Sequence, residues 1–100
     1  MATRIGKAGD IGAGRMRAFS VGGRKVAIAN VDGRFYGFDD TCTHMGCSLA
    51  AGSLDGTTVT CACHGSEFDV TTGEVLEGPA EDSVNTWTVR TDGDDLVVEA

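Results

Sequence analysis

The stretch that decides the fold is residues 42–64, CTHMGCSLAAGSLDGTTVTCACH. It contains all four cysteines and both histidines of the 100-residue chain. Cysteines that only fill a core would be spread along the sequence, whereas the ligands of one bound group gather in a few short segments. This concentration therefore indicates a metal or cofactor site.

The spacing within the stretch gives two elements of the same kind. Cys42-x-His44 and Cys61-x-x-His64 are separated by sixteen residues, and each offers one thiolate and one imidazole. In a Rieske [2Fe-2S] centre, thiolates hold one iron and imidazoles hold the other. The two elements together would supply such a ligand set.

Zinc is the alternative at this point, because it also accepts mixed cysteine and histidine ligands. Structural zinc sites usually pair a cysteine with a cysteine, or a histidine with a histidine, a few residues apart. A Cys-x-His element does not fit that frame. A zinc-stapled module, and a plain core with buried cysteines, are therefore weaker interpretations of the same residues.

The motif resembles that of Rieske iron–sulfur proteins. The resemblance continues through CHGSEFD at 63–69 and GPA at 78–80. It implies one [2Fe-2S] cluster per chain, with Cys42 and Cys61 binding the inner iron and His44 and His64 binding the outer one. It also implies an all-β fold, an antiparallel β-sandwich or barrel scaffold with a small cluster-binding subdomain at about 41–81.

The remaining cysteines are Cys47 and Cys63. In the Rieske proteins that include those of cytochrome bc complexes, cysteines at these places form a disulfide between the cluster loops, and the resemblance implies the same pair here. Such a bond would limit the separation of two loops that have little packing of their own. Two reduced thiols are the alternative, because a reducing cytosol disfavours disulfides.

Four further residues are expected beside the cluster by the same resemblance. Gly65 would allow close backbone approach, and Pro79 would cover the cluster from a third side. Ser66 matches a serine that donates to a cluster sulfide in high-potential relatives, whereas Phe68 replaces a tyrosine donor of those relatives. We therefore expect a midpoint potential between the extremes of the Rieske range, which spans about −150 to +300 mV.

Alternating apolar residues predict strands along the rest of the chain. The first third reads as a three-stranded antiparallel meander with tight turns at Gly22-Gly23 and Asp32-Gly33. The expected strands are 16–21, 25–31 and 34–38 in the meander, 57–60, 67–70 and 74–76 around the site, and 85–90 and 96–98 as a terminal hairpin. One hundred residues suit one domain, 1–100.

Charge is unevenly distributed along the chain, whose formal net charge is −7. Residues 1–34 carry seven basic and two acidic groups, and residues 35–100 carry one basic and thirteen acidic groups. The acidic part holds the site, which suits a docking face for a basic redox partner, although solubility alone would also account for the charge. Four acidic side chains near the site are expected to be exposed, so that screening weakens their opposition to an added electron: Asp39, Asp40, Glu67 and Asp69. Nucleic acid is excluded as a partner.

These observations predict a soluble one-electron carrier and not an enzyme. It would pass electrons from a flavin-dependent reductase to a terminal oxygenase or similar acceptor, as a cytoplasmic monomer. Both histidines are assigned to the cluster, so none remains for a catalytic mononuclear iron site. No apolar run is long enough to span a membrane. The alternative is a small Rieske subunit of a larger redox enzyme of the arsenite oxidase or nitrite reductase type.

Overall fold

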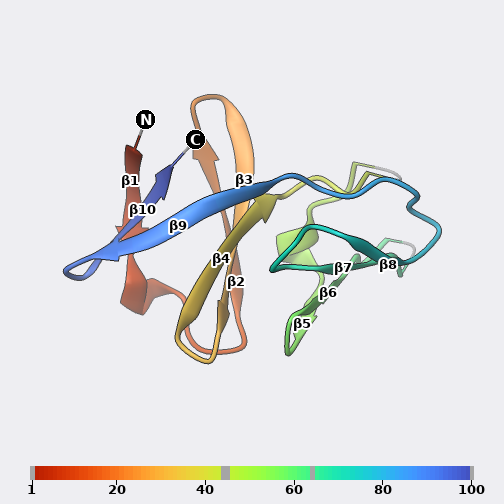
Figure 1. Ribbon diagram of the computed structural model, residues 1–100, viewed down its shortest axis with the longest axis horizontal. Helices are drawn as coiled ribbons and strands as arrows, with labels where there is room; N and C mark the ends of the chain where they lie inside the picture. The colour runs from red at the N-terminus through yellow and green to blue at the C-terminus, as the bar shows by residue number, and fades with distance from the viewer. Residues whose placement is uncertain (1, 44–45, 64, 100) are drawn as a thin grey trace.

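The computed structural model describes residues 2–43, 46–63 and 65–99. Within these ranges the chain forms strands and two single-turn 3-10 helices, η1 (Ala8–Asp10) and η2 (Leu49–Ala51). The expected all-β class is confirmed. Figure 1 shows two groups of strands, one near both termini and a smaller one at the opposite end of the molecule.

The larger group is a six-stranded antiparallel sheet, the scaffold, in the order β1-β10-β9-β4-β3-β2. Its strands are β1 (Ala2–Lys7), β2 (Met16–Val21), β3 (Arg24–Val31), β4 (Arg34–Asp39), β9 (Thr86–Asp92) and β10 (Asp95–Glu99). The predicted meander is confirmed as β2-β3-β4, and the terminal hairpin as β9-β10. The β3-β4 turn places Asp32 at φ 52° and Gly33 at φ 89°, as a two-residue hairpin turn requires.

One scaffold strand was missed. β1 pairs antiparallel with β10, and its register shifts between Arg4 and Gly6. Its sequence, ATRIGK, lacks a clear apolar alternation, and four of its six residues are exposed. Because pairing with β10 forms this edge strand, no strong local preference marks it in the sequence.

The smaller group is a four-stranded antiparallel sheet in the order β5-β6-β7-β8. Its strands are β5 (Ser53–Asp55), β6 (Thr58–Thr60), β7 (Glu67–Asp69) and β8 (Val75–Glu77). We call residues 41–81, which contain this sheet, the cluster lobe. Each strand is three residues long, so the sheet has few ladder bonds to hold it.

Strand β3 joins the two parts because both of its faces are buried. Val26 and Ile28 pack into the scaffold core, whereas Ala27 and Ala29 pack into a second core shared with the cluster lobe. The small alanine side chains let the lobe approach the sheet closely. The second core consists of Ala27, Ala29, Phe38, Cys42, Leu49, Val59, Cys61, Phe68, Val70, Ala80 and Val84.

The described part of the chain is elongated, with extents of 39 × 27 × 19 Å. Strand β9 begins beside the cluster lobe and runs across the scaffold to the β10 hairpin (Figure 1). No helix in the described ranges has the length and apolar character that crossing a membrane requires.

Candidate metal centre

Two loops bring the cysteines together. The first loop, residues 42–47, follows β4 and is closed by a bridge between its two flanking residues, Thr41 and Ser48. The second loop, residues 61–66, joins β6 to β7, which pair with each other. Each loop is thus anchored at both ends before any bound group is considered.

The two loops have the same hydrogen-bond pattern. In the first loop, the Cys42 N–H donates to the Cys47 carbonyl at 2.8 Å, and the Gly46 N–H donates to the Cys42 carbonyl at 2.8 Å. In the second, the Cys61 N–H donates to the Ser66 carbonyl at 2.8 Å. There too the fifth residue, Gly65, donates its N–H to the carbonyl of the first, Cys61, at 3.1 Å. The equivalence inferred from the spacing therefore extends to the backbone.

A glycine in the fifth position makes this loop form accessible. Gly46 has φ 75° and Gly65 has φ 78°, in the left-handed region that other residues rarely adopt. The sequence interpretation assigned Gly65 to close approach, but the backbone angle already accounts for the glycine. Gly46 was missed. The signal for it was its place four residues after Cys42, matching Gly65 after Cys61.

Cys42 and Cys61 lie at the first position of their loops and are each 2 % exposed. Both belong to the second core, and neither takes part in a disulfide. A thiol buried among apolar side chains gives a bound group a soft ligand that is shielded from water. These two residues fit the inner, sulfur-ligated half of a [2Fe-2S] cluster.

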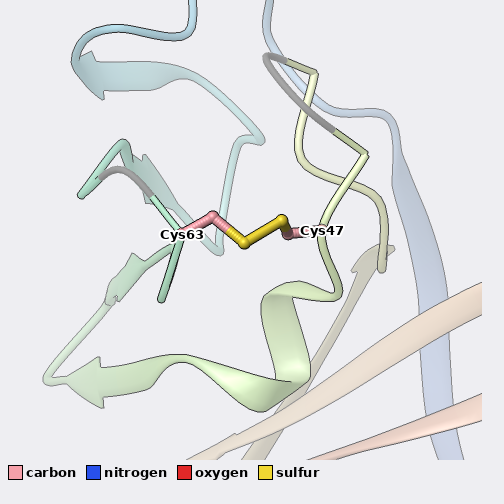
Figure 2. Close-up of a disulfide and its surroundings, with 2 residues drawn as sticks. All are labelled: Cys47 and Cys63. Atoms are coloured by element: carbon pink, nitrogen blue, oxygen red, sulfur yellow. A yellow bond between two sulfur atoms is a disulfide. The ribbon is translucent and has the colours of Figure 1, made fainter.

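The other two cysteines form a disulfide that joins the loops. The sulfur atoms of Cys47 and Cys63 are 1.97 Å apart (Figure 2), and the pair implied by the resemblance is present. The Cys61 sulfur lies within 4.8 Å of both of these sulfurs. This trio is not a three-thiolate metal site, because two of its sulfurs are bonded to each other and offer no thiolate.

His44 and His64, the two imidazole ligands that the resemblance implies, lie outside the described residues. The described neighbour of His44 is anchored, because the Thr43 hydroxyl donates to the Asp82 carbonyl at 2.7 Å. That contact ties the first loop to the chain that follows Pro79.

Ser66 connects the second loop to the proline segment. Its side chain is fully buried, and its Oγ accepts a hydrogen bond from the Ala80 N–H at 3.0 Å. A hydroxyl that accepts this bond still has its proton to donate elsewhere. The Gly78–Pro79 peptide bond is cis, and Pro79 is exposed whereas Ala80 is buried. The contact with Ala80 was not foreseen from the sequence.

Phe68 is fully buried opposite Val59 on the neighbouring strand. It belongs to the same core as Cys42 and Cys61, so it packs beneath both loops. A phenyl ring contributes apolar area at this place and no hydrogen-bond donor.

The expectation that Asp39 and Asp40 are exposed, screened acids is wrong. Asp39 accepts a hydrogen bond from the Trp87 Nε1–H at 2.8 Å and lies 3.5 Å from the Arg24 guanidinium. Asp40 is 2 % exposed and accepts hydrogen bonds from Ser48 and Ala50. Consecutive carboxylates at the end of a strand resemble a solvated turn in the sequence, so nothing marked Asp40 as buried or Asp39 as half-buried.

The charged side chains are divided unequally between the two parts of the fold. The cluster lobe carries six acidic side chains and no basic one, whereas the rest of the chain carries eight basic and nine acidic side chains, which together give −7. Ion pairs between described residues all lie outside the lobe. The contrast is therefore between the two parts of the fold rather than between residues 1–34 and residues 35–100. The acids of the lobe are Asp55, Glu67, Asp69, Glu74, Glu77 and Glu81.

Comparison with known proteins matches residues 2–88 to the family described as Rieske [2Fe-2S] domain. The ferredoxin component of biphenyl 2,3-dioxygenase from Rhodococcus jostii (strain RHA1) is 35% identical over 97 residues, covering 97% of this chain and 91% of the relative. The biphenyl dioxygenase ferredoxin subunit of Pseudomonas sp. (strain KKS102) is 42% identical over 77 residues, covering 76% and 71%.

Solved structures of dioxygenase components contain chains with the same fold. A complex of reduced oxygenase and oxidised ferredoxin in carbazole 1,9a-dioxygenase contains a chain that superposes with a TM-score of 0.91 at 32% identity, covering 97% of this chain and 91% of that one. The ferredoxin of carbazole 1,9a-dioxygenase from Nocardioides aromaticivorans IC177 gives a TM-score of 0.94 at 25% identity, covering 98% and 96%.

Proposed function

This chain belongs to the Rieske [2Fe-2S] domain family, and on that premise we propose that it carries single electrons from a flavin-dependent reductase to a terminal oxygenase. Its relatives are ferredoxin components of dioxygenase systems. Like them it is an electron carrier and not itself an enzyme. The zinc interpretation is set aside by the family match.

The observation that carries the proposal is the pair of equivalent loops. Each begins at a buried cysteine and closes on a left-handed glycine, and a disulfide joins the two loops. We assign Cys42 and Cys61 as the sulfur ligands and His44 and His64 as the nitrogen ligands. When bound, a Rieske cluster supplies a one-electron couple with a potential of about −150 to +300 mV.

The residues around the loops have separate roles. The disulfide keeps the two loops at a fixed separation, and the apolar core beneath them excludes water from Cys42 and Cys61. The Ser66 hydroxyl is held by Ala80 with its proton available for a sulfur acceptor. Such a bond would favour the reduced state, because it stabilises added negative charge.

The acidic lobe favours a basic redox partner. It carries six acidic side chains and no basic one, and Glu67 lies directly opposite Glu77 on the neighbouring strand. Like charges in this register destabilise a sheet. A cationic partner surface would relieve that repulsion and speed encounter. We propose that the chain works as a free monomer in the cytoplasm and meets the reductase and the oxygenase in turn.

The test is electron transfer to a terminal oxygenase at rising ionic strength. Reduced protein mixed with an oxidised Rieske-type terminal oxygenase, such as that of carbazole 1,9a-dioxygenase, should be reoxidised in a second-order reaction whose rate falls as NaCl is raised. Glu77→Gln should slow the reaction at low salt, whereas Asp92→Asn, on the scaffold and paired with Arg4, should leave it unchanged. Absence of reoxidation, or equal rates at all salt concentrations, contradicts the proposal.

A further inference from the structure

Asp40 is the buried charged side chain that the proposed function leaves without a role. It follows β4 directly and precedes Cys42 by two residues, and it is 2 % exposed. Burying a carboxylate costs free energy unless hydrogen-bond donors surround it. The identity of those donors therefore indicates what the residue does.

Three hydrogen bonds join Asp40 to residues 48–50, which follow Cys47, and one joins it to the scaffold. Its Oδ2 accepts from the Ser48 hydroxyl at 2.7 Å, and its Oδ1 accepts from the Ala50 N–H at 2.8 Å. Its carbonyl accepts from the Leu49 N–H at 2.7 Å. Its own N–H donates to the Lys25 carbonyl on β3 at 3.1 Å.

These contacts close the first loop at its base. Asp40 lies at the entrance of the loop, and Ser48, Leu49 and Ala50 lie at its exit. The second loop needs no such device, because the paired strands β6 and β7 close it. The first loop leaves from a scaffold strand and returns into a 3-10 turn, and the Asp40 carboxylate adds two side-chain hydrogen bonds to the backbone bridge between Thr41 and Ser48.

We propose that Asp40 is a positioning residue for the ligand Cys42: its carboxylate holds the first loop against the scaffold by joining the start of the loop to its end. This inference rests on the proposed function, because it assigns Cys42 to the cluster.

Asp39 provides a matched control one residue away. Its partners all lie on the scaffold: the Trp87 indole, the Arg24 guanidinium, and the Asn85 carbonyl that accepts its N–H at 2.9 Å. Its charge faces a cation, and it makes no recorded contact with residues 48–50. Substitution of Asp39 should disturb the scaffold and leave the first loop in place.

The experiment compares purified holoproteins carrying Asp40→Asn, Asp40→Ala and Asp39→Asn. An asparagine in place of Asp40 can accept from Ala50 and donate to Ser48, so this variant should keep the wild-type electron paramagnetic resonance spectrum. Asp39→Asn should keep that spectrum as well, together with the wild-type exchange rate at Ala50. Asp40→Ala loses both bonds, so the Ala50 amide should exchange its hydrogen at least about tenfold faster and the resonance should broaden.

Two results would overturn the inference: wild-type amide exchange at Ala50 in Asp40→Ala, or a resonance as broad in Asp39→Asn as in Asp40→Ala. If Asp40→Ala does not fold, Ser48→Ala removes one of the two bonds and should give a smaller acceleration at Ala50. A wild-type protein without a Rieske spectrum would instead contradict the proposed function. Amide exchange at Ala50 would still show whether Asp40 holds the end of the first loop.

Discussion

The scaffold and the cluster lobe are stabilised in different ways. The scaffold has strands of five to eight residues, an apolar core of its own and all the ion pairs found among the described residues. The lobe has four three-residue strands, a core borrowed in part from β3, and a disulfide. A small lobe that cannot bury much apolar area depends on cross-links and a bound group.

The scaffold therefore mainly provides stability, whereas the cluster lobe mainly holds the site. The scaffold can tolerate change without moving the two loops, whereas almost any change in the lobe reaches a cysteine through the shared core. The two parts meet in the second core, through the small residues of β3 and Phe38 of β4, and at Asp40. We therefore expect the lobe to fail first under stress, with the scaffold still folded.

The largest expected effect comes from Phe68→Ala. Phe68 is fully buried beneath both loops, and truncation of such a ring costs about 3–5 kcal/mol. Visible absorbance of the cluster should be lost at a lower temperature than the Trp87 fluorescence transition of the scaffold. Leu96→Ala, equally buried in the scaffold core, should lower both transitions together. Coincident transitions in Phe68→Ala would contradict the separation of the two parts.

Removing the disulfide should have the next largest effect. Cys47 and Cys63 are sixteen residues apart in the sequence, and a cross-link of this span contributes about 2–4 kcal/mol. The double variant Cys47→Ser, Cys63→Ser should release iron to a chelator faster, with an unchanged scaffold transition. Alkylation of denatured, unreduced wild-type protein provides the check. Full labelling of both cysteines would show that the bond is absent in the purified protein.

Ser66→Ala tests the hydrogen bonds of the second loop. It leaves the Ala80 N–H without its acceptor, which costs about 1–3 kcal/mol, and it removes the proposed donor to a sulfur. The midpoint potential should fall. Phe68→Tyr adds a phenolic donor and should raise it. Protein-film voltammetry measures both, and a midpoint unmoved by either change would show that these side chains do not reach the cluster sulfurs.

The smallest effect is expected at the scaffold edge, where Asp95 pairs with Lys7 and Arg4. The hydrogen bond from Lys7 lowers the pKa of Asp95, and the same contact raises the pKa of Lys7. A lowered carboxyl pKa gives stability that is present near neutral pH and lost as the pH falls through the folded-state value. Acidification should therefore destabilise the wild type slightly more than Asp95→Asn, measured by the Trp87 transition. An equal acid response would contradict this pairing in solution.

Much of the scaffold was predictable because its signals are local. The alternation in β2, β3 and β4, and the Asp32-Gly33 turn, depend on residues a few positions apart. Strand β1 was missed because it is formed by pairing with β10 at the other end of the chain. The division of charge between the two parts of the fold also needed the tertiary structure, since residues 82–100 return to the scaffold.

The site was predictable where chemistry depends on spacing. The two cysteine-containing elements and their equivalence follow from the sequence, and the structure adds their common hydrogen bonds. The role of Asp40 was hidden, because its partners lie eight and ten residues later and involve a backbone N–H that no sequence pattern marks. The contact of Ser66 with Ala80 was hidden for the same reason.

The most direct test of the account is iron and acid-labile sulfide analysis of the purified protein. The ligand assignment predicts about two irons and about two sulfides per chain, lost in Cys42→Ser and in Cys61→Ser and retained in Asp39→Asn. Stoichiometric zinc without labile sulfide would contradict the assignment of Cys42, His44, Cys61 and His64 to a [2Fe-2S] cluster.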